Sequence, residues 1–143
     1  MTDPAIVMRK LAALREHAER IRRRLPATAE ALRSDVDLQD ALSMSLLVTV
    51  QAALDIAMHI AADDKLGLPS TYAESFALLA QHQIVPADTC DQLSRMAALR
   101  NRIAHGYASV DFARIWSELP AGLRAFEAFA IAVARHLQSG AGS

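Results

Sequence analysis

The stretch LSMSLLVTVQAALDIAMHIAA, residues 42–62, is apolar on nearly every side when it is drawn as a helix. Such a helix either spans a membrane or lies at the centre of a bundle or at a subunit interface. Three polar residues interrupt the stretch: Gln51, Asp55 and His59. They argue against a membrane span, because charge is costly at bilayer depth and no neighbouring segment could form a second span to pair with it. We therefore predict a long helix over about Asp35–Asp63 that forms a core and does not enter a membrane.

The composition around this stretch favours helices throughout. Apolar residues make up 52% of the 143 residues, aromatic residues only 5%, and there are five Gly and five Pro. Chains of this length form one domain with a buried core, and strong helix formers without β-branched clusters favour an all-α protein. We predict a single domain over residues 1–138, built as an up-and-down helical bundle, and a disordered tail over 139–143.

Local signals predict where the other helices begin and end. Asp3-Pro4 is a cap followed by a proline at its tolerated position and begins the first helix. Thr71-Tyr72-Ala73-Glu74 has the form of a capping box and opens a short helix that buries Tyr72. Pro120 is expected to break or kink the helix that starts near Asp111. The last helix is expected to end at Ser139-Gly140.

Net charge and cysteine content exclude some classes of protein. The formal charge is −1, which gives no overall electrostatic argument for nucleic-acid binding. The one cysteine, Cys90, excludes an intrachain disulfide and a cysteine-rich metal site, which is typical of a reducing, cytoplasmic setting. The first 25 residues are too dense in charge for a signal peptide. We expect neither a metal nor a cofactor.

Residues 99–107, LRNRIAHGY, carry the chemistry of the chain. Arg100 falls in the middle of an apolar helical stripe that runs from Asp88 to Ala104, where a leucine would be expected. His105 lies in the last turn, Gly106 is expected to end the helix in the left-handed conformation, and Tyr107 falls just beyond it. A cation, a titratable imidazole and a phenol are thus grouped at one helix end.

These residue types suit cleavage of RNA, which supplies its own nucleophile in the 2′-hydroxyl. His105 can act as acid or base near neutral pH, and the Arg100 guanidinium can stabilise the charge that develops on phosphate. Asn101 can add a hydrogen bond. Gln51, Asp55 and His59 share one helical face. This face is either partly exposed or satisfied by its own hydrogen bonds, or it faces Arg100 and His105, with Asp55 pairing the guanidinium or orienting the imidazole.

The segment RNRIAHGY resembles the signature of the HEPN-domain ribonucleases, and of the HepT-like toxins in particular. The resemblance runs from about Leu11 to Phe112, including the helix with Ala53-Leu54-Asp55-Ile56-Ala57, but Gly106 stands where the family often has an acidic residue. It implies a HEPN-type bundle, a two-fold homodimer with a composite cleft, and metal-independent cleavage that leaves a 2′,3′-cyclic phosphate. It also implies a cognate MntA-like nucleotidyltransferase antitoxin that transfers AMP from ATP to Tyr107.

Basic residues provide candidate contacts to the RNA backbone. Arginines cluster at the end of the first helix, where they form either a solvated basic face or a phosphate-binding patch. The candidates are Arg20, Arg22, Arg23, Arg24 and Arg102.

Two other readings of the chain stay open. In the first, the domain only binds a nucleotide or docks a nucleotidyltransferase, and Arg100 and His105 hold phosphate without turnover. In the second, the chain is a helical dimerisation protein in which Arg100 makes a buried interface salt bridge, for example with Asp55. Nuclease assays separate the first from an enzyme. The second predicts that loss of Arg100 unfolds or dissociates the protein.

Overall fold

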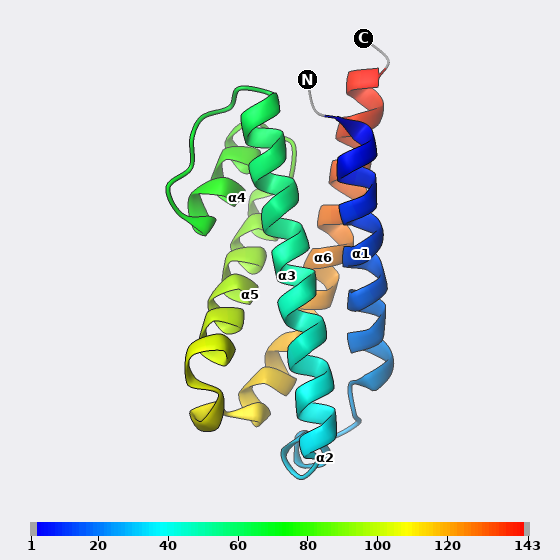
Figure 1. Cartoon of the computed structure of the whole chain (residues 1–143), viewed down its shortest axis with the longest axis vertical. Coiled ribbons are helices and arrows are strands. Elements are labelled where there is room, and N and C mark those ends of the chain that lie inside the picture. Colours follow the sequence, from blue (N-terminus) through cyan, green and yellow to red (C-terminus); the bar gives the residue numbers. More distant parts are fainter. Residues whose placement is uncertain (1–2, 142–143) are drawn as a thin grey trace.

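A computed structural model describes residues 3–141 of the chain. Four long helices form the bundle, and their directions alternate along its axis, with the described ends of the chain at the same end (Figure 1). This confirms the predicted all-α, up-and-down architecture. The elements are α1 (Pro4–Arg24), α2 (Ala29–Arg33), α3 (Val36–Asp63), α4 (Tyr72–Gln81), α5 (Ala87–Gly106), the 3₁₀ turn η1 (Tyr107–Ser109) and α6 (Phe112–Ala141).

The helix α3 is the core helix, as predicted. Val50, Leu54 and Ile56 are each at most 1% exposed, and α1 packs along much of the helix. By length and composition α3 could cross a membrane, but 61% of its most apolar window is buried inside the bundle. The apolar character of α3 is therefore explained by packing between helices.

The short helix α4 starts at a side-chain cap. The Thr71 hydroxyl accepts from the Glu74 amide at 3.1 Å, while the Glu74 carboxylate accepts from both the amide and the hydroxyl of Ser70. The two bonds from Ser70 to the carboxylate lower the pKa of Glu74. Phe76 is buried edge-on against Phe129 of α6, with ring centroids 6.2 Å apart. Tyr72, predicted to be buried, is 43% exposed, because it is the first residue of α4 and its ring lies beside α5 instead of in the core.

The end of α5 differs from the prediction. Gly106 belongs to the helix and has φ −150°, so it does not adopt the left-handed conformation. The chain continues directly into η1, where the Val110 amide donates to the Tyr107 carbonyl at 3.3 Å. Hydrogen bonds of this 3₁₀ turn satisfy carbonyl groups at the helix end, so no left-handed residue is needed there.

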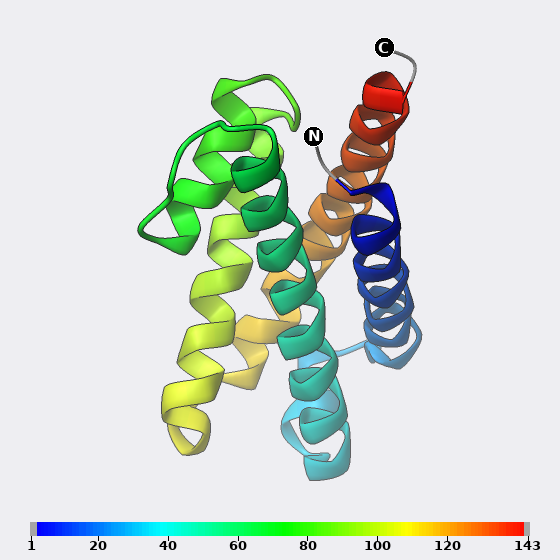
Figure 2. The same cartoon turned by 45° about the horizontal axis from the view of Figure 1, so that its top comes forward.

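The helix α6 runs through Pro120 without a break, so of the two predicted outcomes, a break or a kink, only the kink remains. Figure 2 shows its first part, in gold, inclined to the longer orange and red part, as expected when a proline removes one helical hydrogen bond. The helix continues to Ala141, so Ser139 and Gly140 are helical and do not form a tail. Residues 142–143 of the predicted tail lie outside the described range.

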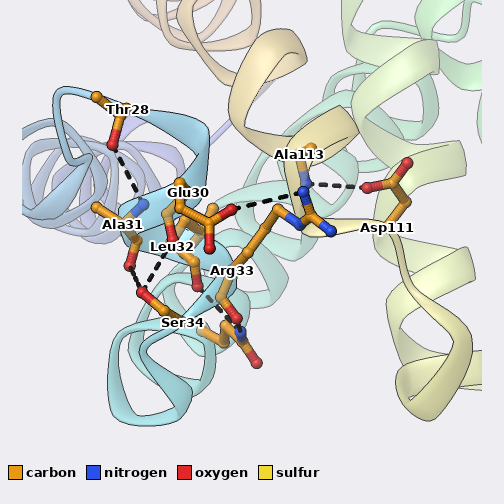
Figure 3. Close-up of polar contacts among 9 residues, drawn as sticks. Thr28, Glu30, Ala31, Leu32, Arg33, Ser34, Asp111 and Ala113 are labelled. Carbon is orange, nitrogen blue, oxygen red and sulfur yellow. Dashed lines mark hydrogen bonds and ion pairs between the residues drawn. The ribbon is translucent and has the colours of Figure 1, made fainter.

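Caps and one long-range bond fix the end of the bundle that holds α2, and Figure 3 shows the caps. Thr28 accepts from the Ala31 amide at the start of α2, and Asp111 accepts from the Ala113 amide at the start of α6. The Trp116 indole donates to the Pro26 carbonyl at 2.9 Å and so joins α6 to the α1–α2 link. The motif, residues 99–107, lies near this end of the bundle, because η1 follows α5 and leads directly into α6.

Candidate functional site

Arg100 is held by neutral groups on the face shared by α3, α4 and α5. Its Nη2 donates to Oε1 of Gln51 on α3 at 2.9 Å, and its Nη1 donates to Oδ1 of Asn101 at 3.2 Å. The guanidinium carbon lies 5.9 Å from the centroid of the Tyr72 ring, within the range of a cation–π contact. These contacts confirm that Arg100 lies on a packed face.

The positive charge of Arg100 has no carboxylate partner among residues 3–141. It is partly buried, and its Nε is buried without a hydrogen-bond acceptor. The partly buried Arg20, by contrast, pairs with Glu16 at 2.7 Å. A desolvated cation held by amide oxygens keeps its full charge, so this position is suited to binding an anion.

Asp55 does not pair with Arg100 or orient His105, contrary to the prediction. Its Oδ1 accepts from Nε2 of Gln51 at 2.8 Å and its Oδ2 accepts from Nζ of Lys10 at 3.4 Å. The reason is steric: Gln51 lies one turn earlier on α3 and occupies the space next to the guanidinium. Asp55 is therefore connected to Arg100 only through Gln51.

The polar face of α3 reaches the motif only in part. Gln51 contacts Arg100 as expected, whereas His59 lies further along the helix beside Asp63, with Nε2 and Oδ2 3.0 Å apart. The expectation that this face lies against Arg100 is confirmed for Gln51 alone.

His105 lies on a different side of α5 from Arg100. It is exposed, and no side chain in the described part of the chain makes a hydrogen bond or ion pair with it. It lines an open pocket of about 420 Å³ between the end of α5 and the start of α6. The floor of this pocket includes Leu99 and Ile115, and Arg102 and Arg114 lie at its wall, where both pair with Glu118.

Tyr107 is fixed on η1 by contacts to two other elements. Its hydroxyl donates to Oδ1 of Asp40 on α3, and its ring packs edge-on against Phe112 at 6.0 Å between centroids. Burial and then the hydrogen bond to Asp40 raise the pKa of the phenol, while Ser43 opposes them. The side chain is still 40% exposed, so a second protein can reach it.

The structure thus gives the three motif side chains separate surroundings within one chain. Arg100 faces α3 and α4, His105 faces the pocket beside α6, and Tyr107 is tied to the start of α3. Sequence reasoning missed Asp40 and Lys10 as partners, because hydrogen bonds between distant helices leave no local pattern. Gln51 was detectable, since it is a polar residue inside the apolar stretch.

The arginines at the end of α1 divide into two kinds. Arg20 and Arg22 pair with Glu16 and Glu19 on the same helix, as expected of a solvated face. Arg23 and Arg24 are exposed. In Figure 1 α1 and α5 lie on opposite sides of α3, so this basic run is not next to the motif within one chain.

Histidine, cysteine and acidic residues do not gather into a metal-binding group anywhere in the described range. Cys90 is buried, and burial together with the nearby Asp91 and Asp88 raises the pKa of its thiol to about 11.

Comparison with known proteins identifies a family and relatives. Residues 14–133 match the family model described as ribonuclease HepT-like. The chain is 30% identical over 124 residues to the mRNA nuclease HepT of Shewanella oneidensis, covering 87% of this chain and 92% of that protein. It is 27% identical over 109 residues to the tRNA nuclease HepT of Aphanizomenon flos-aquae, covering 76% and 74% of the two chains.

Solved structures share the fold. The tri-AMPylated HEPN toxin of Shewanella oneidensis in complex with MNT antitoxin superposes with a TM-score of 0.83 at 29% identity, covering 94% of this chain and 99% of that one. A toxin–antitoxin structure with AMP-PNP gives a TM-score of 0.84 at 27% identity, covering 92% and 98%. The Bacillus subtilis cytosolic protein YutE, of unknown function, shares the fold alone, with a TM-score of 0.86 at 15% identity over 99% and 95%.

Proposed function

The chain belongs to the HepT-like ribonuclease family, and from this premise we propose that it is the ribonuclease toxin of a toxin–antitoxin pair that acts in the cytoplasm. The observation that carries the proposal is the state of Arg100, a partly buried cation held by two amide oxygens and by no carboxylate. Such a group binds an anion, and the RNA phosphate is the anion that the named relatives' activity requires.

The chemistry follows from Arg100 and His105. The 2′-hydroxyl attacks the adjacent phosphate, an imidazole takes up its proton, and the 5′-oxygen leaves with a proton from an acid. The products are a 2′,3′-cyclic phosphate and a free 5′-hydroxyl, and no metal is needed. Arg100 stabilises the charge on the phosphate, and Asn101 holds the guanidinium.

A homodimer supplies the second catalytic histidine that one chain lacks. One histidine cannot easily act as both acid and base in an in-line displacement, and within a chain Arg100 and His105 face different sides of α5. The exposed face of α3 carries Met44 and Met58, 60% and 42% exposed, on either side of Gln51. Two copies that pack through this face would bury its apolar groups and bring two motifs together.

The pocket beside His105 supports a place for the RNA strand. Its apolar floor can take a base, and Arg102 and Arg114 at its wall can contact the backbone. Arg23 and Arg24, and more weakly the glutamate-paired Arg20 and Arg22, are proposed as outer contacts of a long RNA.

The partner is a small MntA-like nucleotidyltransferase, encoded with the toxin, that transfers AMP to Tyr107. Tyr107 is partly exposed at a helix end, so another enzyme can reach it. Each added phosphate carries negative charge toward a site that binds phosphate, and this charge and bulk would exclude the RNA. The complexes of relatives with MNT antitoxin support this partner.

The decisive test is cleavage of a labelled RNA in EDTA by the parent protein, Arg100→Ala and His105→Ala. We expect a loss of about a hundredfold or more for each variant, with a folded protein and cyclic phosphate ends from the parent. Arg95→Ala, an exposed arginine of α5, is the matched control and should keep full activity. Equal cleavage by His105→Ala and the parent would exclude the mechanism.

The second candidate is a binding module without turnover, which the unpaired Arg100 also permits. It predicts that the parent binds RNA or a nucleotide but does not cleave RNA, and that Arg100→Ala lowers binding. The same assay, read as binding and as cleavage, separates the two functions.

A further inference from the structure

We infer that Gln51 is a positioning residue for Arg100, and that the row Lys10–Asp55–Gln51 holds the guanidinium in place while leaving its charge unpaired. The inference rests on the proposed function, because it assigns a purpose to the charge on Arg100. It concerns residues of α1 and α3, outside the motif on α5.

Two neutral acceptors surround the guanidinium of Arg100. Nη2 donates to the amide oxygen of Gln51 and Nη1 to the amide oxygen of Asn101. Both acceptors are neutral, so they fix the orientation of the guanidinium without cancelling its charge. A carboxylate at position 51 would hold Arg100 equally well but would compete with phosphate for it.

Asp55 fixes the orientation of the Gln51 amide. An amide can turn over and present either its oxygen or its NH₂ group to a neighbour. Asp55 accepts from Nε2 of Gln51 at 2.8 Å, and since a carboxylate only accepts, the NH₂ group must face Asp55. The oxygen of Gln51 therefore faces Arg100, which only donates.

The charge of Asp55 is balanced within the row by Lys10. Lys10 pairs with the second oxygen of Asp55 at 3.4 Å, so the negative charge of Asp55 is met by Lys10 at the outer end. The charges of Lys10 and Asp55 cancel, and Arg100 keeps its positive charge. This outer ion pair is more than a third exposed, so its effect is the weakest of the three.

Two variants of Gln51 separate charge from orientation. Gln51→Glu places a carboxylate against Arg100, and Gln51→Met removes the acceptor at nearly the same size without adding charge. The matched control is Gln138→Glu, which adds the same charge at an exposed position near the end of α6. Each folded variant is assayed for cleavage and for binding of a single-stranded oligoribonucleotide over a range of salt concentrations.

Gln51→Glu should lower cleavage about tenfold or more and reduce the salt dependence of RNA binding by about one phosphate contact, a slope change of ~0.7 for a single strand. Gln51→Met should lower cleavage about tenfold through loss of orientation and leave that slope unchanged. A purely structural role would give both variants the same slope. Gln138→Glu should match the parent in both assays.

Asp55→Asn keeps the inference testable if Gln51→Met fails to fold. It lets the Gln51 amide turn over and should lower cleavage several-fold with an unchanged salt slope. Parental cleavage and an unchanged slope in folded Gln51→Glu would overturn the inference. If the parent binds RNA but does not cleave it, the proposed function fails. The salt dependence of RNA binding by Gln51→Glu and Gln51→Met still tests whether the row Lys10–Asp55–Gln51 holds Arg100.

Discussion

The hydroxyl of Tyr107 on η1 donates its hydrogen bond to the carboxylate of Asp40 in the second turn of α3. The bond joins residues that are 67 positions apart and ties the end of the motif to the core helix. It also places a proton acceptor directly on the phenol that is the proposed site of modification.

The first prediction concerns the titration of Tyr107. Burial first, and then Asp40, raise its pKa above the ordinary value of 10.0, so Asp40→Asn should lower the pKa and leave the part due to burial. Ultraviolet titration of phenolate in a Tyr72→Phe background, where Tyr107 is the one tyrosine left, measures this. Asp37→Asn, in the first turn of α3, is the control and should change little.

The sign of the linked stability effect is fixed by the direction of this shift. The folded protein holds the phenol proton to higher pH than the unfolded chain. The stabilisation is therefore complete below the ordinary pKa and is lost as pH rises through the raised one. Asp40→Asn should make the loss of stability above pH 10.0 shallower. A steeper loss would contradict the assignment.

The second prediction concerns transfer of AMP from ATP by the cognate nucleotidyltransferase. Tyr107→Phe should gain no AMP, and Tyr72→Phe, which removes a phenol of similar exposure, should be modified like the parent. Asp40→Asn should be modified more slowly, because the carboxylate accepts the phenol proton while the oxygen attacks the α-phosphate and pyrophosphate leaves. Intact-protein mass over time measures the reaction, and AMP on Tyr72 would refute the site.

The third prediction concerns the exposed face of α3. Met44→Lys combined with Met58→Lys should convert a dimer to a monomer without loss of helix content and should abolish RNA cleavage, because burying two lysines in a self-complementary interface is unfavourable. Ile131→Lys, which adds a charge at an exposed apolar position of α6, should leave the dimer intact. Light scattering coupled to size-exclusion chromatography measures the oligomeric state. A parent protein that is monomeric at the assay concentration would contradict the proposed dimer.

The fourth prediction concerns the packing of α5 on α6. A Cβ at Gly122 would lie 2.3 Å from the sulfur of Met96, so Gly122→Ala forces that side chain to move. The crowding costs about 1–3 kcal/mol, against a gain of up to about 1 kcal/mol in helix propensity, and the net effect should be a destabilisation of ~1 kcal/mol. Denaturant unfolding measures it.

The control for this prediction lies on the same helix. Apart from its chain neighbours and its own helix backbone, a Cβ at Gly140 would meet no atom of the described residues within 4 Å, so Gly140→Ala should be neutral or slightly stabilising. Met96→Ala leaves a cavity when made alone, and it should become less costly when combined with Gly122→Ala. If the effects of Met96→Ala and Gly122→Ala on the free energy of unfolding are additive, the contact between these two residues does not limit the packing of α5 on α6.

Much of the fold is predictable from the chain alone. The apolar stretch over residues 42–62 predicts the core helix, and Asp3, Thr71 and Asp111 are read correctly as places where helices start, because caps act within a few residues. The unbroken helix at Pro120 and the wrongly predicted helix end at Gly106 have related causes. Each residue weakens a helix locally, but packing on the bundle and the 3₁₀ turn sustain the helical path.

The amino-acid sequence by itself determined the helical class, the order of the helices and the placing of Arg100, His105 and Tyr107 at or just beyond the end of α5, since these depend on periodicity and residue type. Only the tertiary structure decided their partners: Gln51 for Arg100, Asp40 for Tyr107, and Lys10 with Gln51 for Asp55. The reason is physical. A side-chain hydrogen bond between helices depends on how far each helix is rotated and shifted against the other, and that registry is set by the sum of core packing rather than by any local stretch of chain.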